Sequence, residues 1–440
     1  MTVGCQNAVS RSHDKSITIC LAAGVFWSLV GAVVSRGLTL VASIVAARTL
    51  GAAGFGELGI IQNTQGLFGV LAGAGLGLAA TKFVAEYCSV DPLKASRCIL
   101  LATLVSVIAG LIGASILFVY AGELAASVLK APHLVRELQV ATGLILFGAV
   151  NGVQTGVLAG LGDFRAVARL SILRGACLFF ALVIGIRSAG VMGGVIGLVV
   201  TEGLAVGASQ VALVRVFPLR WKDAFTGPDA VSDITTMLRF SGLAISASLA
   251  TTLAFWFVNV LLVNERDGYV ALGVFNAADR WRQVLLFLPA AFSPILLSML
   301  SNMHGKNEFD GFRKLFRVSL VVNIAVVVLP ALLLIQFAPQ AMNLFGTEFR
   351  DGTLTLIILS FSTLAVVLNT ILGQVLISKG AMGWRFAMDI LLSSILSLVA
   401  WLLVPTWREL GLALAYLISY SLTAVALIVP VIWYSTEKKV

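Results

Sequence analysis

Long apolar runs separated by short polar breaks fill most of this chain. An α-helix needs roughly 20 apolar residues to cross the hydrocarbon core of a bilayer, and the first two runs exceed that, so we expect them to tilt or to extend beyond it. We therefore predict an all-α, polytopic membrane protein. Its predicted membrane-spanning helices lie at 17–47, 57–84, 98–120, 137–161, 166–186, 190–216, 238–263, 270–300, 315–337, 353–378, 384–404 and 409–434.

The longest polar break covers residues 217–237 and divides the twelve predicted helices into two sets of six. Because six is an even number, both sets start on the same side of the membrane, and a repeat of this kind is related by an axis along the membrane normal. We expect two parallel six-helix lobes. The predicted organisation is a cytoplasmic tail at 1–16, an N-terminal lobe at 17–216, a cytoplasmic linker at 217–237, a C-terminal lobe at 238–434 and a cytoplasmic tail at 435–440.

A glycine-containing motif occurs twice, as Leu50–Gly56 and as Asp267–Gly273, at an offset of 217 residues. A second pair of glycine-containing segments follows at nearly equal distances: Gly162 lies 106 residues after Gly56, and Gly380 lies 107 residues after Gly273. Two marks at matching offsets indicate a duplicated membrane domain, which is typical of transporters. We interpret the glycines of Leu50–Gly56 as turn positions between spans and not as ligand contacts, because glycine gives the backbone conformational freedom. We interpret Gly162–Arg165 as a tight turn with a positive-inside anchor.

The composition supports the same class. The chain is 59% hydrophobic and only 12% charged, and a soluble protein of 440 residues needs more charge to cover its surface. Its five cysteines and three histidines are not arranged at metal-ligand spacing. We predict neither a metal site nor a cofactor.

The distribution of basic residues predicts the topology. If the N-terminus is cytoplasmic, the inner segments carry 19 Lys and Arg side chains and the outer segments carry 7. The positive-inside rule then places both termini in the cytoplasm. The net charge of +9 is explained by this topology and by contact with anionic lipids, so binding to nucleic acid need not be invoked.

Apart from the charges near the span ends, seven charged residues lie at membrane depth in the predicted spans. A charge at membrane depth is costly and usually faces a cavity or a partner, although side chains near a helix end can also snorkel to the interface. The basic residues outnumber the acidic ones, and a positive cavity suits an anionic substrate such as a phosphate or pyrophosphate, because a guanidinium group can pair with two oxygens at once. The basic residues are Arg36, Arg174, Arg280 and Arg282, and the acidic ones are Glu202, Asp279 and Asp389.

Helical spacing places four polar residues of the span at 270–300 on one face. Asn276, Asp279, Arg280 and Gln283 stand at i, i+3, i+4 and i+7. We predict that Arg280 faces the lumen, and that Arg282 either pairs with Asp279 or reaches the outer interface. A structural ion pair explains Asp279 and Arg282 about as well as a gate does.

Other intramembrane polar residues also admit two interpretations. Asn63 and Asn259 lie in stripes of small and polar residues, which are more often helix-packing surfaces than substrate paths. Glu202, Asp279 and Asp389 could take part in proton or sodium coupling, or could form structural pairs.

Several segments together resemble a known family. Ala47–Gly56 reads Ala-Arg-Thr-Leu-Gly-Ala-Ala-Gly-Phe-Gly, and the glycine-rich second span ends in Thr81–Tyr87, followed by the turn Gly162–Arg165 and, in the second half, Ala271–Phe275. In these features the chain resembles the polysaccharide transporter family, the O-antigen and exopolysaccharide flippases. That family belongs to the multidrug/oligosaccharidyl-lipid/polysaccharide (MOP) exporter superfamily, with the multidrug and toxic-compound extrusion exporters and the lipid II flippases. The family often has proline where this chain has Ala52, so we expect a less rigid turn.

The resemblance implies two six-helix bundles around a central cavity, with alternating access. It implies a substrate of oligosaccharide on undecaprenyl pyrophosphate, moved from the cytoplasmic to the outer face of the bacterial plasma (inner) membrane for O-antigen, capsule or exopolysaccharide synthesis. Expected partners are this lipid-linked substrate, anionic lipids, and the polymerase and chain-length proteins of the same pathway. We predict that the pyrophosphate or acidic sugars contact Arg36, Arg280 and Arg174, and that other substrate contacts come from Asn63, Asn276, Gln283 and Asn259.

Two other functions remain open at this point. A multidrug exporter of the same superfamily would be expected to have acidic lumen residues for organic cations, whereas the first span has Arg36. A membrane-bound polysaccharide polymerase or glycosyltransferase would be expected to have a large extramembrane loop or a carboxylate cluster at the interface, and the sequence has neither.

Overall fold

The structure is a computed structural model that describes residues 14–88, 90–217, 248–305 and 309–436. These residues form helices and the turns between them, and no β-strand occurs among them. Nearly all of the predicted linker at 217–237, the first ten residues of the predicted span at 238–263, and most of both predicted tails lie outside the described residues.

The chain divides into two compact units. The first unit comprises residues up to Ala42 and Ile61–Leu249, and the second comprises Ser43–Ile60 and Ala250–Val440. The segment Ser43–Ile60 therefore belongs to the second unit, although the chain on either side of it belongs to the first. The predicted lobe boundaries stay a prediction.

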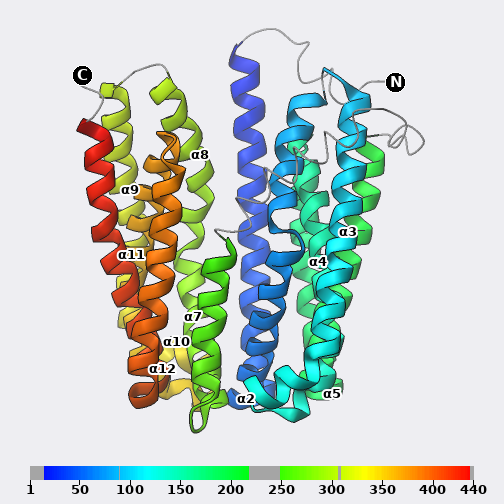
Figure 1. The fold of residues 1–440 in the computed structure, drawn as a ribbon, viewed down its shortest axis with the longest axis vertical. Helices are drawn as coiled ribbons and strands as arrows, with labels where there is room; N and C mark the ends of the chain where they lie inside the picture. Colours follow the sequence, from blue (N-terminus) through cyan, green and yellow to red (C-terminus); the bar gives the residue numbers. More distant parts are fainter. Residues whose placement is uncertain (1–13, 89, 218–247, 306–308, 437–440) are drawn as a thin grey trace. The chain divides into compact units, whose positions relative to one another are not determined.

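In the first unit, α4 (Val135–Gly160) packs between α3 (Pro92–Glu123) and α5 (Phe164–Val216) (Figure 1). Helix α2 (Asp14–Tyr87) precedes them. Aspartates start two of these helices, because the side chain of Asp91 accepts the Lys94 backbone N–H at 3.0 Å and that of Asp163 accepts the Ala166 N–H at 3.0 Å.

In the second unit, α11 (Thr353–Ser378) is the central helix and contacts most of its neighbours. A helix at Ser248–Val263 precedes α7. The helices around α11 are α7 (Gly268–Leu285), α8 (Phe287–Gly305), α9 (Phe309–Gln336), the short α10 (Ala338–Asn343) and α12 (Met382–Thr436).

Two of the long helices are hairpins. Within α5, Ala189 and Gly190 leave the helical conformation, and a Cβ on Gly197 would lie 2.4 Å from the carbonyl oxygen of Ala181. Helix α12 turns at Arg408 in the same way, and a Cβ on Gly411 would lie 2.4 Å from the Leu403 oxygen. Each helix thus folds back on itself in close backbone contact.

These turns coincide with predicted polar breaks. The breaks at 186–190 and 404–409 correspond to the turns of α5 and α12, and the break at 47–57 contains Gly51, whose φ of +71° interrupts the α-helical path of α2. By length and apolar composition, seven helices in the described part of the chain are able to cross a membrane, or eight if α7 and α8 form one bent span. The protein is therefore a multi-pass, all-helical membrane protein, and the exact number of twelve spans stays a prediction.

Helices α7 and α8 meet at a bend of 49° at Leu286. The bend lies three residues before Pro289. Proline has no N–H to donate to the carbonyl four residues earlier, and its ring crowds that carbonyl. The relevant carbonyl belongs to Leu285, the last residue of α7, so the position of the bend follows from Pro289.

Each unit has its own apolar core and a broad apolar exterior. The first core includes Leu76, Phe83 and Ile99, and the second includes Leu300 and Ile371. Large apolar side chains are also exposed along the helices, such as Val119, Ile184 and Trp401. Exposed apolar surface of this extent is unusual for a soluble monomer and is expected for helices that face lipid.

The two copies of the repeated motif contact each other within the second unit. A Cβ on Gly56 would lie 1.9 Å from the carbonyl oxygen of Tyr269, and a Cβ on Gly273 would lie 1.9 Å from that of Ala52. Tyr269 and Gly273 stand at the same offset of 217 residues from Ala52 and Gly56, so the contact is the same in both directions, as in an isologous interface. Gly56 and Gly273 are therefore close-packing positions, and our interpretation of Gly56 as a turn residue is wrong, whereas Gly51 does occupy a turn.

Candidate substrate site

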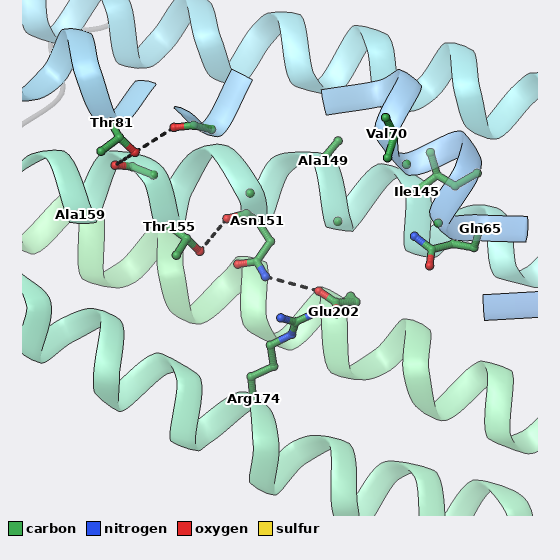
Figure 2. Close-up of a pocket in the computed structure, with 16 residues that line it drawn as sticks. Gln65, Val70, Thr81, Ile145, Ala149, Asn151, Thr155, Ala159, Arg174 and Glu202 are labelled. Carbon is green, nitrogen blue, oxygen red and sulfur yellow. Dashed lines mark hydrogen bonds and ion pairs between the residues drawn. The ribbon is translucent and has the colours of Figure 1, made fainter. Parts of the chain in front are cut away.

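A cavity of about 680 Å³ lies in the first unit, between α2, α4 and α5. Ligand sites for small molecules commonly have volumes of about 300–1,000 Å³. Its polar lining comes from Gln65 and Thr81 of α2, Asn151 and Thr155 of α4, and Arg174 and Glu202 of α5 (Figure 2). Much of the remaining wall consists of the glycines Gly66, Gly69, Gly77, Gly148, Gly152 and Gly156.

Close backbone packing of α2 against α4 forms one end of the cavity. A Cβ on Gly156 would lie 2.3 Å from the Gly77 oxygen, and one on Gly77 would lie 2.8 Å from the Gly152 oxygen. The Thr81 hydroxyl lies 2.9 Å from the carbonyl oxygens of both Gly77 and Gly156 and bridges the two helices. Small residues commonly permit such an approach of membrane helices, and hydroxyl side chains then hydrogen-bond across the interface.

The Glu202 carboxylate is the centre of the polar part of the cavity. It forms an ion pair with the guanidinium group of Arg174 and accepts a hydrogen bond from the Asn151 side-chain amide at 3.4 Å (Figure 2). Ser209 donates to the other end of the same amide, at 3.3 Å from Asn151 Oδ1. The Glu202 side chain is 13% exposed and that of Arg174 is 50% exposed, so the carboxylate is largely buried and the arginine is open to the cavity.

Of the substrate contacts predicted from the sequence, the structure places Arg174 in this cavity. Glu202, predicted as a coupling residue or structural partner, lies beside it. Arg36 is exposed on α2 and Asn63 is partly buried on the same helix, and neither belongs to the cavity lining. Sequence reasoning missed Asn151 and Gln65, although an amide within an apolar span is itself a signal.

A second polar cluster lies in the second unit around Asp279. Arg282 Nε lies 2.6 Å from Asp279 Oδ1, and the Gln283 amide donates to Asp279 Oδ2 at 2.7 Å. The Arg282 guanidinium also lies over the Tyr416 ring, at 4.9 Å from its centroid, which is a cation–π geometry. Arg282 therefore adopts the paired alternative, while Arg280 is partly buried on the same helix.

Asp389 pairs with Arg385, which is one of the 19 basic residues that the topology prediction placed on the cytoplasmic side. Arg385 contacts both carboxylate oxygens of Asp389, with distances of 2.6 and 3.0 Å, and also donates to the Asn369 carbonyl at 3.3 Å. Such bidentate pairs are among the stronger protein hydrogen bonds. Each of the three intramembrane acids identified from the sequence thus has an arginine partner.

The remaining predicted contacts, Asn259 and Asn276, lie on helices of the second unit and differ in their hydrogen bonding. Asn259 is buried, and its side-chain amide donates to the Phe255 carbonyl of its own helix at 2.7 Å. Asn276 packs against Gly59, where an added Cβ would lie 2.0 Å from its amide nitrogen, and this buried nitrogen has no hydrogen-bond partner in the part of the chain that the structure describes. No cluster of three or more potential metal ligands occurs among the described residues.

Comparison with solved structures shows that this helical fold is shared with transporters of the MOP superfamily. An inward-facing multidrug resistance MATE family transporter of the MOP superfamily aligns with a TM-score of 0.79 at 15% identity, over 92% of this chain and 99% of that chain. A MOP superfamily transporter from Pyrococcus furiosus, described as having a binding pocket of reverse polarity, gives a TM-score of 0.72 at 15% identity over 95% and 96% of the two chains.

Sequence relatives narrow the class. The family described as "Polysaccharide biosynthesis protein" matches residues 21–297, and this chain belongs to it. The Lipid III flippase of Escherichia coli (strain K12) is 24% identical over 433 residues, which cover 91% of this chain and 95% of the flippase. The capsular polysaccharide biosynthesis protein CapF of Staphylococcus aureus is 24% identical over 160 residues, 36% of this chain and 40% of CapF. The resemblance to polysaccharide transporters of the MOP superfamily is confirmed.

Proposed function

We propose that this protein is a lipid-linked oligosaccharide flippase. It moves glycan repeat units on undecaprenyl pyrophosphate from the cytoplasmic to the outer face of the bacterial plasma membrane, for O-antigen, capsule or exopolysaccharide synthesis. The observation that carries the proposal is the similarity to the Lipid III flippase along 95% of that protein's length. The family match over residues 21–297 points the same way.

A flippase must lower the free-energy cost of moving a polar head group across the hydrocarbon core of the membrane. A glycan diphosphate carries charges and many hydroxyl groups, and their transfer into hydrocarbon without hydrogen-bond partners costs several kcal/mol for each group. A polar cavity inside a helical bundle supplies those partners, while the isoprenoid tail stays in the lipid. The cavity of the first unit, with its amide, hydroxyl and charged side chains, supports this role.

The proposed architecture has twelve spans in two six-helix lobes, with both termini in the cytoplasm. Three of the long helices described above contain a turn, and each of these helices is longer than one membrane crossing. The turns lie at Gly51, Ala189–Gly190 and Arg408, and they support twelve spans over the seven or eight counted by length. The reciprocal contact between the two motif copies supports the duplication. Alternating access then follows from rocking of one repeat against the other.

Anion recognition in the proposed mechanism depends on Arg36 and Arg280, which contact the diphosphate or acidic sugars. Both are guanidinium groups at predicted membrane depth, and such groups pair well with phosphate oxygens. Coupling to an ion gradient is assigned to the pairs at Glu202, Asp279 and Asp389, where protonation or cation binding would release the partner arginine.

The competing function is export of cationic drugs, favoured by the fold that the chain shares with MATE transporters. The paired state of Asp279 and Asp389 opposes it, because a carboxylate already neutralised by arginine attracts an organic cation weakly. A membrane-bound polysaccharide enzyme is the third candidate, and the transporter relatives oppose it.

Gene deletion with complementation tests the proposal. Deletion is expected to remove one surface glycan and to leave resistance to cationic dyes unchanged. With Arg36→Ala or Arg280→Ala, the rate at which the surface glycan is restored should fall at least about tenfold below that of wild type. The reason is that a hydrogen bond to a charged group contributes ~1.5–3 kcal/mol. Arg136→Ala, an exposed arginine at the start of α4, serves as the matched control and should complement fully.

Membrane levels of each variant are measured by immunoblot, so that loss of transport is separated from loss of protein. Dye sensitivity with intact surface glycans would refute the flippase and support the drug exporter. Full complementation by both arginine variants would remove the anion-binding assignment and leave the transporter class intact.

A further inference from the structure

The cavity of the first unit differs in charge from a site designed for a diphosphate. We propose that it is a subsite for uncharged sugar residues of the glycan head group, and that the diphosphate binds elsewhere. The inference rests on the proposed function and specifies which part of the substrate this cavity recognises.

Charge balance is the first argument. Among the described residues that line the cavity, Arg174 and Glu202 carry the formal charges, and they form an ion pair. A diphosphate would have to draw Arg174 away from Glu202 and leave a carboxylate that is only 13% exposed beside a second anion. Leaving the largely buried Glu202 carboxylate without its cation is unfavourable, although Arg174 is half exposed, so the cavity disfavours the diphosphate.

Hydrogen-bonding capacity is the second argument. A sugar hydroxyl both donates and accepts, so its site needs acceptors and donors side by side. Glu202 has two carboxylate oxygens with more lone pairs than its partners use, and the half-exposed Arg174 has further N–H groups. Gln65 adds an amide with both functions. Asn151 is a positioning residue, since it donates to Glu202 while it accepts from Ser209.

Shape is the third argument. Gly148 and Gly152 stand on the cavity-lining face of α4, and a Cβ built on either meets no atom within 4 Å. Their Cα positions therefore border open space, and a flat pyranose ring could approach the backbone there. The same fact supplies a probe, because a side chain added at Gly148 would start in open space on the cavity-lining face of α4.

The test uses the purified full-length protein in detergent and two separate probes. The first is the repeat-unit oligosaccharide released from the glycan that disappears on gene deletion, freed of lipid and phosphate. The second is farnesyl pyrophosphate, which has the diphosphate and a short isoprenoid chain but no sugar. Binding is measured from the rise in the thermal unfolding midpoint with probe concentration.

Gly148→Leu fills the subsite, and Gly207→Leu is its control. Gly207 lies on α5 outside the cavity lining and also has open space at its Cβ. We expect wild type and Gly207→Leu to bind both probes. Gly148→Leu should bind the oligosaccharide about tenfold more weakly or worse and farnesyl pyrophosphate as wild type does. Glu202→Gln should strengthen binding of farnesyl pyrophosphate, because Arg174 then lacks its anion.

Each other outcome has a definite meaning. The inference is overturned if Gly148→Leu weakens farnesyl pyrophosphate as much as the oligosaccharide, or if it leaves oligosaccharide binding unchanged. It is also overturned if wild type binds farnesyl pyrophosphate but not the oligosaccharide, and the flippase proposal then survives. If wild type binds neither the oligosaccharide nor farnesyl pyrophosphate, the inference and the flippase proposal are both overturned.

Discussion

The reciprocal contact between the two motif copies makes a quantitative prediction about two alanine substitutions. A Cβ at Gly56 or at Gly273 would lie 1.9 Å from a backbone carbonyl oxygen, whereas Cβ contacts below 3.0 Å essentially do not occur. Since the obstacle is backbone and not a flexible side chain, the helices must separate by about 1 Å. Overpacking of this kind costs about 1–3 kcal/mol.

Because the two positions are equivalent, Gly56→Ala and Gly273→Ala should destabilise the protein equally. The double variant should cost less than the sum, by about 1 kcal/mol, because the first substitution already separates the helices that the second would push apart. Gly207→Ala is the control, since its Cβ enters open space, and it should not lower the stability.

The assay is equilibrium unfolding of the four variants and wild type in the same detergent, followed by intrinsic fluorescence. Unequal effects of the two single substitutions would refute the reciprocal geometry. Strict additivity would refute the shared contact, and wild-type stability of either single variant would show that the helices do not approach as closely as described.

Two further predictions concern individual polar contacts. Arg385→Ala should destabilise the second unit by about 3 kcal/mol, because it leaves the partly buried Asp389 without its cation. Adding Asp389→Asn to the Arg385→Ala variant should recover much of the lost thermal stability. If the second substitution recovers none of it, the broken pair is not the cause of the loss. Glu348 accepts a hydrogen bond from the Ala52 backbone N–H at 2.9 Å, directly after the turn at Gly51. Glu348→Ala should therefore lower the free energy of unfolding by about 1 kcal/mol, the typical effect of losing a helix cap. Glu348→Gln should retain most of the stability in the same unfolding measurement.

The sequence was sufficient for the class of fold because hydropathy reports directly on the membrane. Polar breaks at 186–190 and 404–409 coincided with the hairpin turns of α5 and α12. The repeated motif was also visible, since its spacing is a property of the chain alone. Its role as a packing contact could not be predicted, because a glycine in the sequence is equally compatible with a turn and with close approach of two helices.

The polar pairs show where sequence reasoning stopped. Asp279 and Arg282 are three residues apart on one helix, so their pairing could be proposed from spacing. Arg174 and Glu202 are 28 residues apart and meet only because α5 folds back at Gly190. Arg385 was assigned to the membrane surface by the positive-inside rule, which takes no account of a partner such as Asp389 one turn away.

The assignment of Ser43–Ile60 to the second unit has a consequence for biosynthesis. This segment leaves the ribosome long before Tyr269, Gly273 and Glu348, the residues that it packs against. Tyr269 and Gly273 are made only after about three-fifths of the polypeptide, and Glu348 only after more than three-quarters of it. A fragment that ends near residue 217 would carry this segment without any of its contacts, so co-expressed half-proteins should assemble by exchanging it between polypeptides.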